Sequence, residues 1–274
     1  MKYFKTNKFL LIGVCLLIAL LQGRLEGSNN LKTLYFYNPE TNIDNFAILK
    51  KEFDLYFAQY GEFYITPFSK MDAFEQTMTA TQEGLFLVSS WHFKTLMKAK
   101  KLKPLLIGVI KGGSTHKKVL VVEKKIASLE ALRGKQVASS SSKEYTQGIL
   151  KEMLETNHPD VTSSLRIITV PKDMDALMSV TFGMAESALT TQESLEQLAL
   201  LNPTHHKRLT VLALSDELLL PIVSISNSSM DPAKPLIGIL ERMGADPAAE
   251  EQLRMLGLDG FRPLSAEDKK RLER

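Results

Sequence analysis

Strand-like and helix-like segments alternate along almost the whole chain after residue 33. Short apolar runs such as Leu85–Val88 have the length of buried strands, and the segments between such runs carry apolar residues at helical spacing. One such helix places Phe46, Leu49 and Phe53 on one face, with Asp44 expected as its N-cap. Alternation of this kind predicts sheets covered by helices, which is the α/β class of fold.

The predicted elements form two runs, which are separated by the double glycine of Lys111–Ser114. The strands expected in the first run are Leu34–Tyr37, Phe63–Phe68, Leu85–Val88 and Pro104–Ile110. Those expected in the second run are Val119–Val122, Gln136–Ala138, Arg166–Val170, Ala188–Thr190 and Leu209–Leu214. A further strand, Pro221–Ser226, and three C-terminal helices then complete the chain. The chain is therefore expected to leave a first lobe, build a second lobe and return.

Two lobes suit the roughly 250 residues that follow the N-terminal segment. We expect crossovers near Ile110–His116 and Ser215–Leu220, which puts residues 28–114 and 218–274 in lobe 1 and residues 115–217 in lobe 2. Each lobe is expected to hold a mixed, mostly parallel sheet. Ligands of such folds bind in the cleft at the carboxyl ends of the strands, and the bridging segments can act as a hinge.

The first 27 residues have the pattern of a cleavable secretory signal peptide. Three lysines precede the apolar run Phe9–Leu21, and small residues follow at Gly23 and Gly27. An uncleaved, tilted anchor is the alternative, but a helix needs about 20 residues to span a bilayer and the run is shorter. We expect a secreted protein of the periplasm or another extracytoplasmic space.

Removal of the signal peptide changes both the charge and the chemistry of the chain. The only cysteine, Cys15, lies inside the apolar run, and Ile12–Cys15 resembles a lipoprotein acylation site only faintly. The full chain has 34 Lys+Arg and 31 Asp+Glu, so cleavage after Gly23, which removes three lysines, leaves 31 against 31. A neutral mature protein without cysteine has no disulfide or thiolate metal site, and its charge gives no reason to expect nucleic acid as a partner.

Three segments of the chain resemble one known family. Ser128–Ala138 is similar to the "sl-dL-GK-vA" segment of periplasmic solute-binding proteins of the phosphate/phosphite/phosphonate transporter family. Asp175–Ala188 is similar to the "al-aV-G-aDAa" segment of this family, and Leu253–Phe261 is similar to its "L--lg-dgF" segment. The resemblance implies a type II periplasmic binding protein fold with a Venus-flytrap cleft. It also implies that the protein hands a solute to an ATP-driven membrane transporter.

The chain departs from the family where the family holds its anion. Glu144–Gln147 stands in place of a Ser-Thr-Ser-Gly turn, so only Thr146 keeps a hydroxyl of the usual kind, and Glu186 replaces an aspartate. Ser141 and Glu144 have the spacing of a capping box, which would satisfy helix amides internally, and a carboxylate there repels a dianion. Two interpretations stay open: the serines only cap a helix, or the cleft binds a less charged solute.

The candidate ligand residues follow the ends of the predicted strands. From lobe 1 they are Asn38, Phe68, Trp91 and His92. From lobe 2 they are Ser139, Ser142, Tyr145 and Thr146, with Glu186 or Thr190 nearby. In the alternative interpretation the aromatic side chains pack in the core. We expect phosphonates to bind weakly or not at all, and the solute to be neutral or less negatively charged.

Other polar motifs carry weaker indications. Lys172 and Asp173 lie at a strand-to-helix turn and are equally compatible with the cleft and with the surface. Lys117 and Lys118 are expected to begin a strand, and the glycines before them lack the spacing of a P-loop. His205–His206 is expected in a solvated loop. No metal or cofactor is expected.

The leading functional hypothesis is the substrate-binding component of an ABC-type importer of the phosphate/phosphonate family, with an altered ligand site. Its partners would be a small solute and a membrane permease with its ATPase; the protein is expected to be a monomer and to bind no nucleic acid. One alternative is a stand-alone sensing protein that feeds a membrane receptor. Another is an enzyme on the same scaffold, which the export signal and the lack of a convergent acid, base and nucleophile set disfavour.

Overall fold

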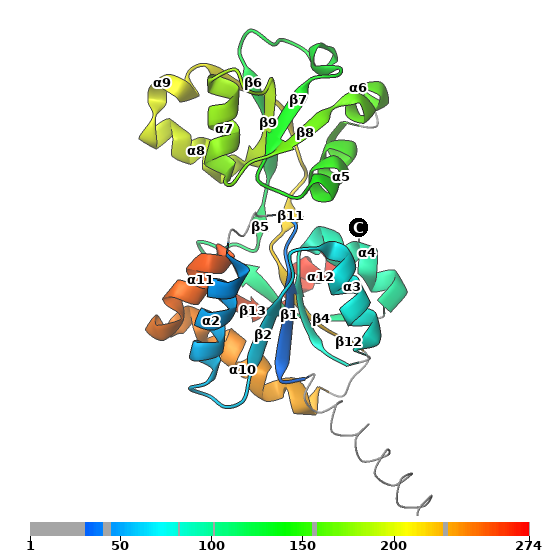
Figure 1. The fold of residues 1–274 in the computed structure, drawn as a ribbon, viewed down its shortest axis with the longest axis vertical. Helices are drawn as coiled ribbons and strands as arrows, with labels where there is room; N and C mark the ends of the chain where they lie inside the picture. Colours follow the sequence, from blue (N-terminus) through cyan, green and yellow to red (C-terminus); the bar gives the residue numbers. More distant parts are fainter. Residues whose placement is uncertain are drawn as a thin grey trace, which may run out of the picture.

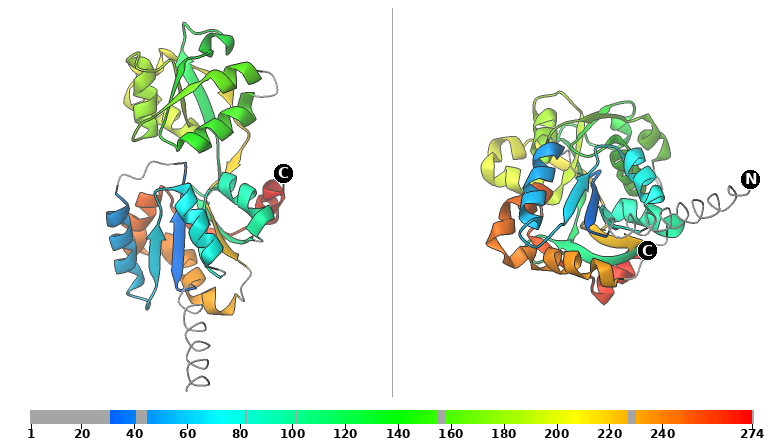
Figure 2. Two further views of the ribbon diagram at one scale, coloured as in Figure 1. Left: turned by 45° about the vertical axis from the view of Figure 1, so that its right-hand side comes forward. Right: turned by 60° about the horizontal axis from the view of Figure 1, so that its bottom comes forward.

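The computed structural model describes residues 31–40, 45–81, 83–100, 102–154, 158–226 and 230–273. The expected signal peptide and the expected cap Asp44 lie outside the described residues; Asn45 is the N-cap of the helix that follows, and its side chain accepts from the backbone N–H of Ile48. Figure 1 shows two lobes, one above the other, with a narrow connection between them, and Figure 2 shows the same division from two other sides. The predicted two-lobed α/β fold is confirmed.

Lobe 1 is built on a six-stranded sheet. In spatial order its strands are β13 (Gly260–Pro263), β4 (Leu102–Val109), β12 (Ile222–Ser226), β3 (Leu85–Val88), β1 (Thr33–Tyr37) and β2 (Tyr64–Pro67). One face packs against α2 (Phe46–Phe57), α10 (Lys234–Arg242) and α11 (Glu250–Leu256). The other face packs against α3 (Met71–Ala80), α4 (Ser90–Lys100) and α12 (Ala266–Leu272).

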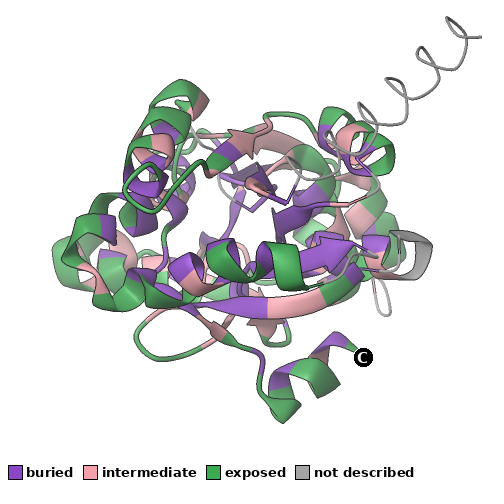
Figure 3. Ribbon diagram, turned by 90° about the horizontal axis from the view of Figure 1, so that it is seen from below, coloured by how far each residue is buried: buried purple, intermediate pink, exposed green. Residues whose placement is uncertain are grey.

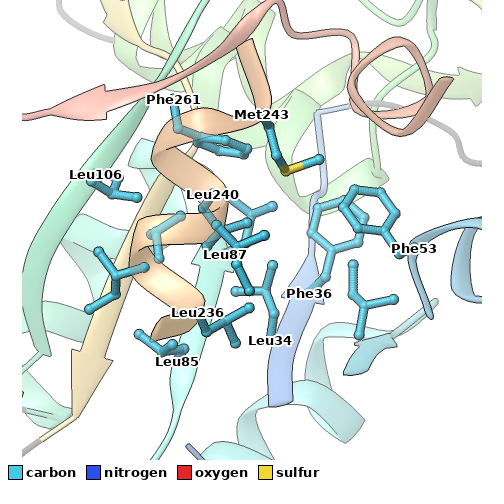
Figure 4. Close-up of a cluster of buried hydrophobic side chains, with 14 of the residues drawn as sticks. Leu34, Phe36, Phe53, Leu85, Leu87, Leu106, Leu236, Leu240, Met243 and Phe261 are labelled. Carbon is cyan, nitrogen blue, oxygen red and sulfur yellow. The ribbon is translucent and has the colours of Figure 1, made fainter. Parts of the chain in front are cut away.

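The core of lobe 1 follows from the alternation of side chains along its strands. Leu34 and Phe36 of β1 pack in the cluster on one face, while Tyr35 and Tyr37 pack in the cluster on the other. Figure 4 shows Phe36 beside Phe53 of α2 in the first cluster. Both faces of the sheet are therefore apolar, as expected for a sheet with helices on each side.

Lobe 2 repeats this arrangement on a five-stranded sheet. In spatial order its strands are β10 (Leu209–Leu214), β6 (Lys118–Glu123), β9 (Ser187–Thr191), β7 (Gln136–Ser139) and β8 (Arg166–Thr169). One face carries α5 (Lys143–Leu154) and α6 (Pro159–Ser164). The other carries α7 (Asp173–Thr181) and α8 (Gln192–Leu201), with α9 (Pro203–His206) beside α8. Four 3₁₀ turns complete the described elements: η1 (Glu130–Leu132), η2 (Asp231–Ala233), η3 (Met243–Ala245) and η4 (Pro247–Ala249).

Buried residues concentrate in the strands, and the exposed residues lie on the outer sides of the helices (Figure 3). Among the described helices, none combines the length and the apolar composition needed to cross a bilayer.

Both sheets contain a smaller share of parallel strand pairings than the sequence predicts. The described strands of lobe 1 form two parallel and three antiparallel pairings. Those of lobe 2 form two of each kind. The parallel pairings belong to the βα units β1–β2, β1–β3, β7–β8 and β7–β9. Each antiparallel pairing involves a strand that leads into or returns from a crossover, namely β4, β6, β10 or β12.

A two-stranded antiparallel sheet connects the lobes. Its strands are β5 (Thr115–His116) and β11 (Leu218–Leu219), with His116 paired to Leu218. Both strands lie within or beside the segments expected to form crossovers. Because one crossover leads out of lobe 1 and the other leads back, we propose residues 28–114 with 218–274 and residues 115–217 as the bounds of the two lobes.

The C-terminal helix α12 holds both crossovers. Asp268 is buried and accepts hydrogen bonds from Ser114 Oγ at 2.8 Å and from Arg262 Nη1 at 2.6 Å. Arg271 forms an ion pair with Glu217 at 2.7 Å, on the returning crossover. Burial of Asp268 opposes ionisation, but the hydrogen bonds outweigh it and hold the pKa of this carboxyl well below its ordinary value.

We expect Asp268→Asn to lower the free energy of unfolding by about 1 kcal/mol at neutral pH, because charged hydrogen bonds become neutral ones. A carboxyl whose pKa is lower in the folded state stabilises the fold above its unfolded pKa of about 4, and this contribution is lost as the pH falls. Urea unfolding should therefore show a difference from wild type that narrows between pH 7 and pH 3. Asp231→Asn, at an exposed ion pair, is the control and should change stability by less than about 0.5 kcal/mol. A difference that grows on acidification would contradict the assignment.

Candidate functional site

A cavity of about 290 Å³ lies between the lobes, where the chain leaves the carboxyl ends of β1, β7, β8 and β9. The two crossovers and the turn after α11 supply its apolar lining. Its polar lining consists of Asn38, Glu40, His116, Lys118, Ser140, Lys172, Asp173, Thr191 and Glu193. The lining thus carries three carboxylates and two lysines, and its net charge is negative when His116 is neutral. The volume suits a small solute, since ligand pockets usually start at about 300 Å³.

Lys118 is the most deeply buried charge of the cavity. It is the first residue of β6, beside the crossover, and is 2% exposed. Its Nζ lies 5.7 Å from the centre of the Tyr145 ring, a cation–π distance. A charge in a buried residue needs compensation, so Lys118 favours an anionic or polar partner in the cavity.

Asp173, the first residue of α7, supplies a counter-charge to Lys118. Its carboxylate accepts hydrogen bonds from Ser140 Oγ and, at 2.9 Å, from the backbone N–H of Thr191. Burial opposes its ionisation, but the charge of Lys118 and these hydrogen bonds lower the pKa of Asp173 below its ordinary value. The ionised carboxylate therefore ties together the ends of β7 and β9 and the start of α7.

Glu40 enters the cavity from lobe 1, after β1. It is 5% exposed, and its Oε2 lies 3.2 Å from Nε2 of His116 on the crossover strand β5. Its Oε1 is buried and has no hydrogen-bond partner among the described residues. A buried carboxylate oxygen without a donor costs free energy, so Glu40 favours a donor in the cavity.

Tyr145 lies beneath these charges, in the first turn of α5. Its side chain is fully buried, and its hydroxyl has no hydrogen-bond partner within the described part of the chain. Burial, followed by the charge of Glu40, raises the pKa of Tyr145 well above its ordinary value. The phenol is therefore neutral across the physiological range.

Two hydrogen bonds join the turn before α5 to the residues that follow β1 in lobe 1. The backbone N–H of Ser142 donates to the carbonyl of Pro39 at 2.7 Å, and Ser141 Oγ donates to the carbonyl of Glu40 at 2.8 Å. Ser142 Oγ accepts from the backbone N–H of Tyr145 at 3.2 Å, so the helix is capped one residue later than the predicted pair of Ser141 with Glu144. The serine turn thus joins the lobes as well as capping the helix.

The single tryptophan completes this contact between the lobes. Trp91, in α4 of lobe 1, meets the Tyr145 ring of lobe 2 edge-on, with 5.6 Å between ring centres. A Cβ atom on Gly148 of α5 would lie 2.8 Å from Nε1 of Trp91, which is too close. Trp91 therefore packs on a glycine that leaves room for it.

Of the ten predicted ligand residues, Asn38 alone lines this cavity. Phe68 packs against Phe74 in the second core cluster of lobe 1. His92 is buried in the same core, where its Nε2 lies 2.9 Å from Glu75 Oε1, and burial lowers its pKa. Trp91 and Tyr145 face each other across the lobes, as described above. For these aromatic residues the structure agrees with the alternative interpretation, in which they are packing residues.

The polar residues predicted from lobe 2 also lie outside the cavity lining. Ser139 and Thr146 are buried and share a hydrogen bond of 3.0 Å between their hydroxyls, while Ser142 caps α5. Thr190 is buried within β9. Glu186 precedes β9, at the opposite end of the sheet, where it accepts from the backbone N–H of Gln136 at 3.0 Å. Glu186 is thus placed away from the site because it comes before its strand rather than after it.

Only some of the residues that line the cavity were considered as candidates from the sequence. The turn of Lys172 and Asp173, which had two equal interpretations, belongs to the cavity. Lys118 and Glu40 were missed, although Glu40 follows a predicted strand end in the same way as Asn38. In the described part of the chain, no group of three or more His, Cys, Asp or Glu side chains is placed to hold a metal ion.

The sequence matches one family model, described as the periplasmic substrate-binding protein of a phosphonate ABC transporter, over residues 61–269. No curated protein matches it.

Solved structures share the fold at low sequence identity. XAC2383 from Xanthomonas citri, bound to a chloride ion, superposes with a TM-score of 0.67 at 16% identity, covering 88% of this chain and 95% of that chain. A binding protein component of an ABC phosphonate transporter from Pseudomonas aeruginosa gives 0.59 at 15% identity, covering 88% and 85%. PhnD1 from Prochlorococcus marinus, in complex with methylphosphonate, gives 0.57 at 14% identity, covering 89% and 97%. These similarities show that the chain shares the fold of these binding proteins.

Proposed function

Because this chain belongs to the family of periplasmic substrate-binding proteins of phosphonate ABC transporters, we propose that it binds a small solute in the cavity between its lobes. It acts outside the cytoplasm, where it delivers the solute to a membrane permease with its ATPase. The protein performs no chemistry on the solute.

The observation that carries this proposal is a pair of opposite, buried charges on the two sides of the cavity. Glu40 comes from lobe 1, and Lys118 comes from lobe 2. Oε1 of Glu40 has no hydrogen-bond partner among the described residues, and the Lys118 ammonium group lies 5.7 Å from the centre of the Tyr145 ring. A solute that bonds to both groups would bridge the lobes, and its binding energy would then favour the closed state of a hinged protein.

The ligand site of this chain is altered in its charge. Three carboxylates and two lysines line the cavity, so a phosphonate dianion would enter a site whose own charge is already negative or near zero. Glu144 stands in the first turn of α5, where an anion would otherwise be favoured by the helix N-terminus. We therefore expect the solute to be neutral or to carry less negative charge than a phosphonate.

A thermal-shift screen of the mature protein tests this function. Phosphate, methylphosphonate, small organic acids, amino acids and polyols form the panel. The true solute at 100 times its dissociation constant should stabilise the protein by about 2.7 kcal/mol, whereas phosphate and methylphosphonate at submillimolar concentration should give no shift. Lys118→Met should abolish the shift.

The matched control for this variant is Lys135→Met, at the opposite end of the same sheet beside Glu186. The control should keep the full shift. If the two variants lose the shift equally, or if methylphosphonate binds at submicromolar concentration, the proposed site and its charge preference are wrong. Uptake of the solute by vesicles that contain the cognate permease and its ATPase distinguishes import from sensing, because a sensor would bind the solute without supporting uptake.

A further inference from the structure

Exposed apolar side chains gather on lobe 2, outside the solute cavity. Phe182 is 63% exposed, Met184 58%, Leu200 84% and Leu201 72%. These are the four most exposed large apolar side chains of the described residues, and they come from the turn after α7 and from the end of α8. We call these four residues the lobe 2 patch. Apolar side chains exposed together in this way mark a surface that binds a partner.

The lobe 2 patch lies at the end of the lobe that is opposite the cavity. The start of α8 is beside the cavity, which Glu193 lines, and Leu200 comes about 10 Å further along the helix axis. The turn that carries Phe182 precedes β9, whose last residue, Thr191, also lines the cavity. Figure 1 shows α9, which follows the end of α8, on the outer part of lobe 2, away from lobe 1. The patch is therefore separate from the solute site.

Backbone and ring contacts fix the patch in place. Gly183 has a positive φ of 71° and ends α7, and the backbone N–H of Met184 donates to the carbonyl of Ser179 at 2.8 Å. The ring of Phe182 meets the ring of His205 in α9 edge-on, with 5.5 Å between their centres. The apolar side chains are thus held at the surface by the folded turns that carry them.

Basic side chains border the lobe 2 patch. Lys207 and Arg208 directly follow α9, and the backbone N–H of Lys124 donates to the carbonyl of Arg208 at 2.9 Å, which brings the end of β6 beside them. Lys125 is the next residue along. Lys124 and Lys207 are exposed and form no ion pair with a described residue, so both ammonium groups are available to a partner.

Fewer carboxylates lie close to this border. Glu123 forms ion pairs with Arg208 and with Lys125, and Glu196 stands one turn before Leu200 on α8. The four basic residues against these two carboxylates leave a net charge of +2. The surface therefore combines projecting apolar side chains with an excess of positive charge.

We propose that the lobe 2 patch binds the surface of a membrane that carries anionic lipid. Its apolar side chains enter the interfacial region, and the lysines contact the lipid headgroups, which is the combination found in proteins that lie on a membrane. A second copy of the chain fits less well, because a twofold contact would set the same basic border against itself. The proposal does not depend on the identity of the solute.

Co-sedimentation of the mature protein with lipid vesicles tests the proposal. Vesicles of phosphatidylglycerol and phosphatidylcholine in equal parts should bind it at least about tenfold more tightly than vesicles of phosphatidylcholine alone. Salt should weaken the binding, because it screens the charge of the headgroups. No binding to either kind of vesicle, or equal binding to both, would overturn the proposal.

Two pairs of serine substitutions separate the patch from other exposed apolar residues. Leu200→Ser with Leu201→Ser should lower the affinity for anionic vesicles at least about tenfold, because two buried leucines are lost from the lipid contact. Ile48→Ser with Leu55→Ser makes the same kind of change on the exposed side of α2 in lobe 1 and should leave the affinity unchanged. If ultracentrifugation shows a dimer that only the first pair dissociates, the patch joins two copies and the proposal is wrong.

Charge reversal tests the contribution of the lysines. Lys124→Glu with Lys207→Glu should abolish the preference for anionic vesicles, whereas Lys70→Glu with Lys103→Glu, at exposed positions of lobe 1, should keep it. Leu200→Trp measures the contact directly, since the emission of the new indole should shift to shorter wavelength when anionic vesicles are added. An unchanged emission, or equal effects of the two lysine pairs, would contradict the assignment of this surface.

Discussion

Replacement of Asp173 by alanine is expected to lower the free energy of unfolding by about 3 kcal/mol or more, because it leaves the buried charge of Lys118 without its counter-charge. The same change removes the acceptor for Ser140 and for the backbone N–H of Thr191, so the cavity wall loses its fixed shape and solute binding should be lost. Chemical denaturation measures the first effect, and calorimetry measures the second.

Two further variants separate this explanation from a general weakening of α7. Asp175→Ala removes a carboxylate two residues along the same helix, where it accepts only from the backbone N–H of Lys172 at 3.1 Å. Asp175→Ala should lower the free energy of unfolding by about 1 kcal/mol, which is the usual effect of losing a helix cap. The double variant Asp173→Ala with Lys118→Met should be more stable than Asp173→Ala alone, since it no longer buries an unpaired charge. If adding Lys118→Met lowers the free energy of unfolding further, the loss of stability in Asp173→Ala is not caused by an unpaired charge on Lys118.

Gly148→Ala is expected to destabilise the protein by about 1–3 kcal/mol, although alanine is the better residue in a helix interior. The new Cβ would lie 2.8 Å from Nε1 and 2.9 Å from Cζ2 of Trp91, so the indole must leave its place on α5. Because Trp91 is the only tryptophan, its emission reports this contact directly, and the maximum should shift to longer wavelength as the ring enters water.

Gly238→Ala, in the middle of α10, is the matched control. A Cβ there would meet only Arg242 Nη1, at 3.4 Å, which is an ordinary contact. The free energy of unfolding of this variant should rise by up to about 1 kcal/mol, because alanine has the higher helix propensity, and the emission of Trp91 should be unchanged. A stabilising Gly148→Ala with unaltered emission would show that the lobes are not held together at this point.

The order of the elements could be predicted because it depends on local patterns. The strands predicted at Leu85–Val88 and Leu209–Leu214 match the structure at both ends. The strand β13 was missed, because it is four residues long and contains Gly260 and Pro263, which are poor strand formers. Its pairing with β4, distant in sequence, makes it a strand, and a local pattern does not record that pairing.

The site could be predicted by region but not by residue. The rule that ligands lie beyond the carboxyl ends of strands led to Asn38, which lines the cavity between the lobes. It also led to His92 and Tyr145, whose helical positions turn them into the cores of their own lobes. Lys118 was predicted to begin a strand, as it does, but its burial beside Tyr145 and the cavity depends on contacts between elements that are distant in sequence. Which side chain faces a cleft depends on how two separately folded units meet, and no local pattern contains this information.

The position of β12 sets an order for the folding of a chain that emerges from its N-terminus. This strand lies between β3 and β4 in the sheet of lobe 1, yet it follows all of lobe 2 in the chain. Lobe 2 is continuous in sequence and can fold as soon as residues 118–214 have emerged. Until Ile222–Ser226 arrives, the edges of β3 and β4 that will hold it have no partner strand, and unpaired edges favour aggregation. The emerging chain therefore passes through a stage in which lobe 2 can be native while the sheet of lobe 1 is still incomplete.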